Sequence, residues 1–122
     1  MSKQKRDQIE EILREVEKEN TDIRASAVVT KDGLLLASAL PEGTDGRNVS
    51  AMAAAIHSAS GRAVKSLTKG DLNEVIANSD KGMVLCRSVG TGVLMTITKE
   101  EPNLGWVRMD MDKAAGKIAE FL

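Results

Sequence analysis

Residues 47–67 read RNVSAMAAAIHSASGRAVKSL, a run with the spacing of a helix that has two packing faces. Its apolar side chains recur at steps of three and four, which places them on one side of a helix that can cover a sheet: Val49, Met52, Ala53, Ile56, Ala63, Val64 and Leu67. A second set at similar steps is made of small residues, which let another backbone approach closely: Ala51, Ala54, Ala55, Ser58 and Gly61.

The second stripe needs an explanation because a surface helix requires only one apolar face. It predicts a partner helix, and in a chain this short we expect a second copy of the same protein to supply it. The alternative is that alanines fill an exposed side because alanine has the best helix propensity.

Length and composition predict a single domain, 1–122, with 42% apolar residues and burial of roughly two-thirds of the unfolded surface. Seventeen basic and eighteen acidic residues leave a net charge of -1, and Trp106 and Phe121 are the two aromatic residues. This balance disfavours nucleic-acid binding, which needs a basic field or stacking platforms. The charged N-terminus has no signal-peptide core, and the apolar runs fall short of the ~20 residues of a membrane span. We therefore expect a cytoplasmic protein without membrane insertion.

The hydrophobic period divides the chain into helix, two strands, helix, three strands and helix. Asp32-Gly33 is a strong hairpin signal between the first two strands, and Thr44 or Asp45 is placed to cap the central helix. The predicted elements are a helix over Lys3–Glu19, strands over Ala25–Thr30 and Leu34–Ala39, the central helix, strands over Leu72–Asn78, Met83–Val89 and Val93–Thr98, and a helix beyond Pro102.

No constellation of residues in the sequence carries recognisable chemistry. Gly61-Arg62-Ala63-Val64-Lys65-Ser66 lacks the second glycine of a phosphate loop and lies at the wrong end of a helix. His57 has no clustered cysteine or carboxylate at ligand spacing, and the single cysteine, Cys86, lies in an apolar strand that predicts a buried thiol. We expect no catalytic residue, no cofactor and no metal.

The chain resembles the roadblock/dynein light chain family over essentially its full length. Three segments carry the resemblance: the strand pair around Ala27–Leu34, the alanine-rich helix Val49–Ser60, and Asn103-Leu104-Gly105-Trp106-Val107-Arg108 at the start of the last helix. The resemblance implies an α+β sandwich of profilin-like architecture. Its antiparallel sheet has five strands in the order 2-1-5-4-3, with the central helix on one face and the N- and C-terminal helices on the other.

Family members dimerise through the central helix and the third strand, so the resemblance implies a homodimer with one continuous sheet. This agrees with the small-residue stripe and with a third strand polar enough for an edge. The expected interface consists of Ala51, Ala54, Ala55, Ser58, Val75 and Ala77.

Family members also scaffold or regulate small Ras-like GTPases, or act as adaptors on motors, without a shared catalytic motif. The resemblance therefore implies a non-enzymatic homodimer that binds a small Ras-like GTPase, with Arg47, His57, Arg62 and Lys65 as the expected contacts. It gives no arginine finger, because GTPase-activating members reposition the GTPase's own groups. One alternative is an adaptor that binds a peptide or motor subunit, for example by strand addition. Another is a small-ligand sensor, which requires an apolar cavity of several hundred cubic ångströms.

Overall fold

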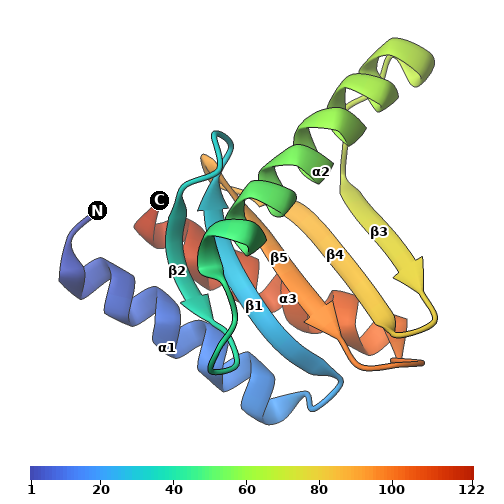
Figure 1. The fold of residues 1–122 in the computed structure, drawn as a ribbon. Helices are drawn as coiled ribbons and strands as arrows, with labels where there is room; N and C mark the ends of the chain where they lie inside the picture. The colour runs from blue at the N-terminus through green and yellow to red at the C-terminus, as the bar shows by residue number, and fades with distance from the viewer.

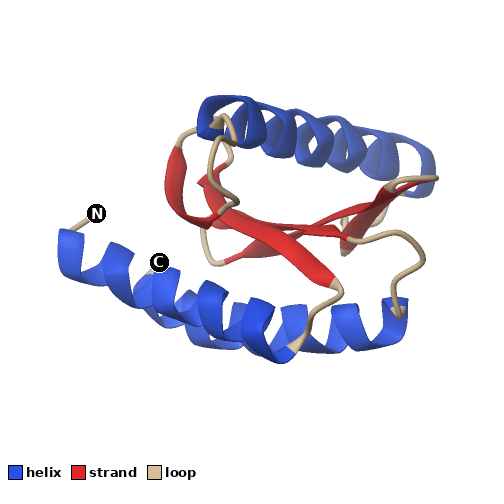
Figure 2. Ribbon diagram, turned by 60° about the horizontal axis from the view of Figure 1, so that its bottom comes forward, coloured by secondary structure: helices blue, strands red, loops and turns tan.

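The computed structural model describes residues 1–122 as a sheet covered by helices on both faces (Figures 1 and 2). Its strands lie in the order β2-β1-β5-β4-β3, and every neighbouring pair is antiparallel. The elements are α1 (Lys3–Glu19), β1 (Ile23–Thr30), β2 (Leu35–Ala39), α2 (Gly46–Thr68), β3 (Glu74–Ser79), β4 (Gly82–Val89), β5 (Gly92–Thr98), α3 (Leu104–Ile118) and the 3-10 turn η1 (Ala119–Phe121).

This arrangement confirms the predicted fold, with α2 on one face and α1 and α3 on the other. Helices α1 and α3 run antiparallel, so the two ends of the chain emerge at the same corner of the molecule (Figures 1 and 2). No helix of the structure has both the length and the apolar character needed to cross a membrane.

The boundaries of the helices follow from caps that the sequence supplies. The Asp45 carboxylate accepts hydrogen bonds from the backbone N–H groups of Arg47 and Asn48, so Asp45 and not Thr44 caps α2. Ser2 caps α1 and Asn103 caps α3 in the same way. The third strand begins at Glu74, two residues later than the pattern predicts.

Gly82, at the turn from β3 into β4, is required by both backbone conformation and close approach. Its φ of 135° lies in a region that L-residues rarely adopt. A Cβ atom there would lie 2.3 Å from the carbonyl oxygen of Thr98. Any side chain at this position would push β4 away from the end of β5.

The larger core fills the space between the sheet and the two terminal helices. Leu13 of α1 and Val107 and Ile118 of α3 are at most 1% exposed. They pack in one cluster of 13 buried residues with strand side chains such as Leu85 and Leu94. Two helices thus seal this face of the sheet.

A buried polar junction fixes the end of α1 to the start of α3. The Asn20 side chain is fully buried and donates to the Asp110 carboxylate at 2.8 Å, while its carbonyl accepts from the backbone N–H of Asp22. The Asp22 carboxylate in turn accepts from the backbone N–H of Asn103 at 2.9 Å and lies 3.5 Å from the Lys99 amine. Every buried side-chain polar atom is satisfied, which a stable core requires.

The smaller core lies under α2 and corrects part of the predicted packing face. Val49 and Ala53 are buried against β1, β4 and β5, and Ile56 packs at the margin of this cluster of seven buried residues. Met52 and Leu67 are instead 48% and 83% exposed, and Ala63 is also exposed. The spacing was right for a helix, but the second half of α2, which carries Ala63 and Leu67, extends past the sheet (Figure 1). Met52 lies in the first half, between the buried Val49 and Ala53, and its side chain is turned away from the sheet.

Candidate protein-binding surface

The outward face of α2 carries the small residues that the sequence singles out. Ala51, Ala55 and Ser58 are exposed. Ala54 is half-buried, because it turns toward the β1–β2 hairpin, where Gly33 lies beside it. Three of the four predicted helix contacts are therefore available to a partner, and the fourth belongs mostly to the hairpin.

Beside this face lies an apolar flank of α2. It consists of Met52, Ala59, Ala63 and Leu67, all exposed and spaced by seven, four and four residues along one side of the helix. The sequence assigned Met52, Ala63 and Leu67 to the sheet and left Ala59 unassigned. Exposed large apolar side chains in one line mark an interaction surface more often than scattered ones do. Sequence analysis did not identify this flank as an exposed surface. The signal for it was that α2 has more apolar positions than a single sheet can cover.

Strand β3 forms the adjoining edge of the sheet, since it pairs only with β4. Val75 and Ala77 alternate onto the face of the sheet that carries α2, where Val75 is half-buried against the smaller core and Ala77 is exposed. Ile76 points to the opposite face and is 38% exposed. A free edge with open apolar side chains is a template for pairing with another strand.

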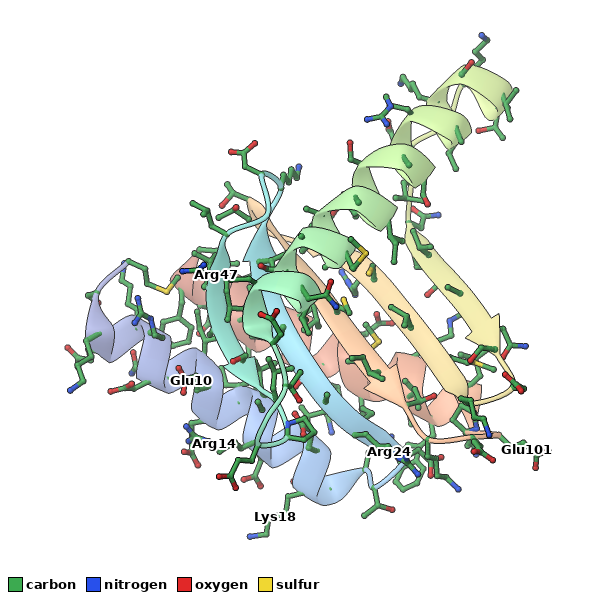
Figure 3. All side chains as sticks on the ribbon, viewed as in Figure 1. Glu10, Arg14, Lys18, Arg24, Arg47 and Glu101 are labelled. Carbon is green, nitrogen blue, oxygen red and sulfur yellow. The ribbon has the colours of Figure 1, made fainter.

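The four basic residues expected to contact a partner do not form one patch. Arg47 lies in the first turn of α2 on the β2 side of the molecule (Figure 3). Lys65 is 18 residues further along, about 27 Å at the rise of a helix, and pairs with Asp71 at 3.4 Å. Arg62 points outward and donates to Ser58 Oγ at 2.6 Å. The structure leaves Arg62 beside the small-residue face and separates Arg47 and Lys65 from each other.

His57 faces the sheet, not the solvent side of α2. Its Nε2 lies 2.9 Å from Ser88 Oγ on β4, and burial together with the charge of Lys31 lowers its pKa from the usual 6.5. A serine–histidine pair becomes a nucleophile only when a third group orients the imidazole and stabilises its charge. Here the nearby charge is a lysine, which opposes imidazolium formation, so the pair serves to hold α2 on β4.

The other chemistry-bearing groups have structural roles. No group of three or more His, Cys, Asp or Glu side chains converges to hold a metal ion. Cys86 is fully buried, and burial raises the pKa of its thiol to about 11, as expected for an inert cysteine. Arg87 of β4 forms an ion pair with Asp112 of α3, and Arg108 of α3 forms one with Glu74 of β3.

These two ion pairs line an open hollow of about 650 Å³ at the start of β3, which sequence analysis did not anticipate. Its walls are mainly polar and charged. A second hollow, between α1 and α3, measures about 180 Å³, and a third, at the start of α1, measures about 600 Å³ and has only polar and charged lining residues. None is the apolar cavity of several hundred cubic ångströms that the sensor alternative requires. The geometry therefore favours macromolecular binding at the α2 surface.

Comparison with known proteins identifies the family of the chain. Residues 8–99 match the model of the Roadblock/LC7 domain. Two uncharacterised proteins of Methanocaldococcus jannaschii are each 37% identical over 110 residues, which is 90% of this chain and 96% of the relative.

Solved structures reproduce the fold at lower identity. A structure described as MglB with tetrameric arrangement has a TM-score of 0.89 at 18% identity, over 99% of this chain and 92% of that one. MglB of Myxococcus xanthus has a TM-score of 0.86 at 21% identity, over 98% and 91%. Sheet order, helix placement and sequence match lead to one conclusion: the chain belongs to the Roadblock/LC7 domain family.

Proposed function

We propose that this protein is a homodimeric, non-enzymatic binding module that regulates or scaffolds a small Ras-like GTPase. The observation that carries the proposal is the apolar flank of α2 (Met52, Ala59, Ala63 and Leu67) lying open beside the free edge of β3. A single partner has to cover the apolar flank of α2 and also pair with the free edge of β3. A second copy offers both, since it presents the same helix and the same edge.

The dimer is assembled about a two-fold axis. Two β3 strands pair antiparallel across the axis and join the two sheets, which removes an exposed edge from each copy. The two α2 helices then lie side by side, and the alanines allow a close approach while Met52 and Leu67 cover the partner. An interface of standard size needs about 800 Å² from each copy.

The GTPase binds to the platform that the paired α2 helices form. The roadblock resemblance supports this class of partner, and Arg62 beside the small-residue face supplies a charge that an acidic patch can meet. Arg47 marks the outer end of the same helix. His57 is not among the proposed contacts, because its ring faces Ser88 of β4.

The dimer is tested by measuring mass with light scattering after gel filtration. Ala59→Glu places a carboxylate in the helix contact, where it would be buried without a partner charge, so we expect a monomer. Ala55→Glu serves as the second variant on the small-residue face. Thr44→Glu adds the same charge in the loop before α2 and should remain dimeric. Dimers in both alanine variants would show that α2 does not form the contact.

GTPase binding is tested by calorimetric titration with the Ras-like GTPase encoded in the same genome, loaded with GDP or with a non-hydrolysable GTP analogue. We expect a difference in affinity between the two states, because only differential binding biases a switch. Arg62→Glu should weaken binding at least tenfold. Arg24→Glu reverses an exposed charge on β1, far from α2, and is the matched control (Figure 3). Absence of binding in both nucleotide states would leave the adaptor alternative.

A further inference from the structure

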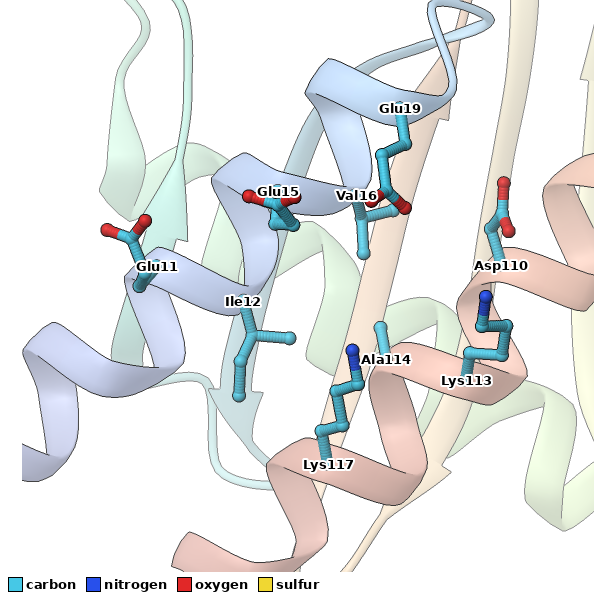
Figure 4. Close-up of a pocket in the computed structure, with 9 residues that line it drawn as sticks. All are labelled: Glu11, Ile12, Glu15, Val16, Glu19, Asp110, Lys113, Ala114 and Lys117. Carbon is cyan, nitrogen blue, oxygen red and sulfur yellow. The ribbon is translucent and has the colours of Figure 1, made fainter.

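The face of the molecule opposite α2 carries a groove that the proposed dimer and its platform do not use. It lies between α1 and α3, has a volume of about 180 Å³, and its floor is apolar. Ile12 and Val16 of α1 point across it toward Ala114 of α3 (Figure 4). Ile12 and Val16 are half-buried at the margin of the larger core, so the floor is firmly supported from below.

The exposed side chains on the two walls of the groove carry opposite charges. The α3 wall also includes the Asp110 carboxylate, which is half-buried and accepts a hydrogen bond from the Asn20 side chain. The exposed charges are the carboxylates of Glu11, Glu15 and Glu19 on the α1 wall and the amines of Lys113 and Lys117 on the α3 wall (Figure 4). These five side chains are all exposed. The steps of four residues along each helix keep each charge on its own wall.

The charges do not neutralise each other across the groove. Glu11 pairs with Arg14 within α1, whereas Glu15, Glu19, Lys113 and Lys117 take part in no ion pair of the structure. An acidic ridge and a basic ridge thus stand on either side of an apolar floor, and four of their five exposed side chains take part in no ion pair. A ligand that lies along the floor would meet both ridges at once.

We propose that this groove binds an amphipathic helix of another protein, with aliphatic residues on the buried side, basic residues on one flank and acidic residues on the other. The basic flank lies against the glutamates of α1, and the acidic flank lies against the lysines of α3. The glutamate ridge runs from Glu11 to Glu19, a rise of about 12 Å along α1, which matches a little over two turns of a docked helix. The inference stands independently of the proposed GTPase platform, which lies on the other face of the sheet.

The charge pattern also fixes the direction of the bound helix. Turning a helix end for end above the groove exchanges its two flanks, so only one direction places opposite charges together on both sides. A peptide whose flanks are exchanged in sequence is therefore expected to bind in the reverse direction, and one with two acidic flanks is expected to bind poorly.

The probe is a designed peptide of about 16 residues, stapled on its outer side because short free helices are marginally stable. It has leucines on one side, lysines on one flank and glutamates on the other, and carries a fluorophore. Anisotropy titration should give saturable binding to the wild-type protein. Glu15→Lys with Glu19→Lys should weaken it at least tenfold. Glu42→Lys with Glu100→Lys makes the same charge change at exposed loop positions outside the groove and should have little effect.

A charge-swap experiment distinguishes binding in the groove from general attraction between charges. The peptide with two acidic flanks should bind the Glu15→Lys, Glu19→Lys protein at least tenfold more tightly than it binds the loop double variant of equal net charge. A nitroxide at the N-terminus of the original peptide should broaden amide signals at one end of α1, and the flank-exchanged peptide should broaden those at the other end.

Three results would overturn the proposal: no saturable binding to the wild-type protein, equal loss in both double variants, or broadening spread over both faces. Self-association that the groove variants abolish would also overturn it, since a second copy would then be the occupant. The groove variants should leave the mass of the dimer and the GTPase titration unchanged, so failure here is distinguishable from failure of the proposed function.

Discussion

The two faces of the sheet differ in how completely the chain covers them. Five strands spaced by about 4.8 Å make a sheet more than 20 Å wide, and a helix with its side chains is about 10–12 Å across. Two helices, α1 and α3, cover one face and enclose a core of 13 buried residues. The single helix α2 covers the other and encloses seven. One face is therefore built for stability, and the other is left one helix short.

The largest effect is expected from breaking the sealed face. Leu13 is 1% exposed in the larger core, so Leu13→Ala should lower the free energy of unfolding by about 3 kcal/mol through lost burial and a new cavity. Urea denaturation at fixed protein concentration measures this loss. A loss below about 1 kcal/mol would mean that α1 packs loosely and that this face is not sealed.

The polar junction at the end of α1 should be the next most sensitive. Asn20→Ala removes the donor to Asp110 and the acceptor for the Asp22 amide, leaving buried groups without partners. We expect a loss of about 2 kcal/mol in the free energy of unfolding. Asn78→Ala changes the same residue type at an exposed position of β3 and should have a much smaller effect in the same denaturation assay.

The open face should respond in the opposite manner. Leu67 is 83% exposed, so Leu67→Ala should change the unfolding free energy of the isolated subunit by less than about 0.5 kcal/mol. The dissociation constant of the proposed dimer should rise several-fold, because the side chain lies on the apolar flank. Sedimentation equilibrium over a dilution series measures this shift. A large loss in unfolding free energy with an unchanged dissociation constant would mean that Leu67 belongs to a core and not to an open interaction face.

The smallest effect concerns an ionisable group under the sealed face. Burial raises the pKa of Glu17 from 4.5 to about 6, against the opposing effect of the hydrogen bond that Ser26 donates to it. Because the folded-state pKa is the higher one, this group's stabilising contribution is complete below pH 4.5 and is lost as the pH rises through 6.

Glu17→Gln replaces the ionisable carboxyl with a neutral amide, so the stability lost on ionisation of Glu17 is no longer lost. It should stabilise the protein at pH 7.5 by less than about 1 kcal/mol, a figure reduced because the side chain is only half-buried. The gain should disappear near pH 4.5. Denaturation midpoints measured across this pH range test the sign, and an equal gain at both ends would mean that ionisation of Glu17 is not its cause.

Most of the fold was predictable because the period of apolar residues and the turn signals act locally. The helix over Lys3–Glu19 has the predicted bounds, and Asp32-Gly33 forms the predicted hairpin turn. Strand order was not encoded in any local pattern, and it came from the family resemblance. The junction through Asn20 could not be predicted, since its partner Asp110 is 90 residues away in the sequence.

The candidate site was harder to predict because exposure depends on where a helix lies relative to a sheet. Residue spacing placed Leu67 on an apolar side of α2 correctly, but it could not reveal that the sheet ends before the helix does. Met52 lies over the sheet but faces away from it, which the spacing also left undetermined. The orientation of the expected contact His57 could not be predicted for a related reason. Its position toward Ser88 depends on the rotation of α2 about its own axis, which a short alanine-rich pattern leaves undetermined.

The shared corner from which both chain ends emerge has a practical consequence. A tag fused to residue 1 or to residue 122, such as a fluorescent reporter or an affinity handle, would lie on the α1 and α3 side of the molecule. The sheet would then separate the tag from α2. Surface immobilisation through either end would then present the α2 platform to the solution, whereas assays of the groove call for a handle elsewhere, for instance at the exposed Lys81 turn.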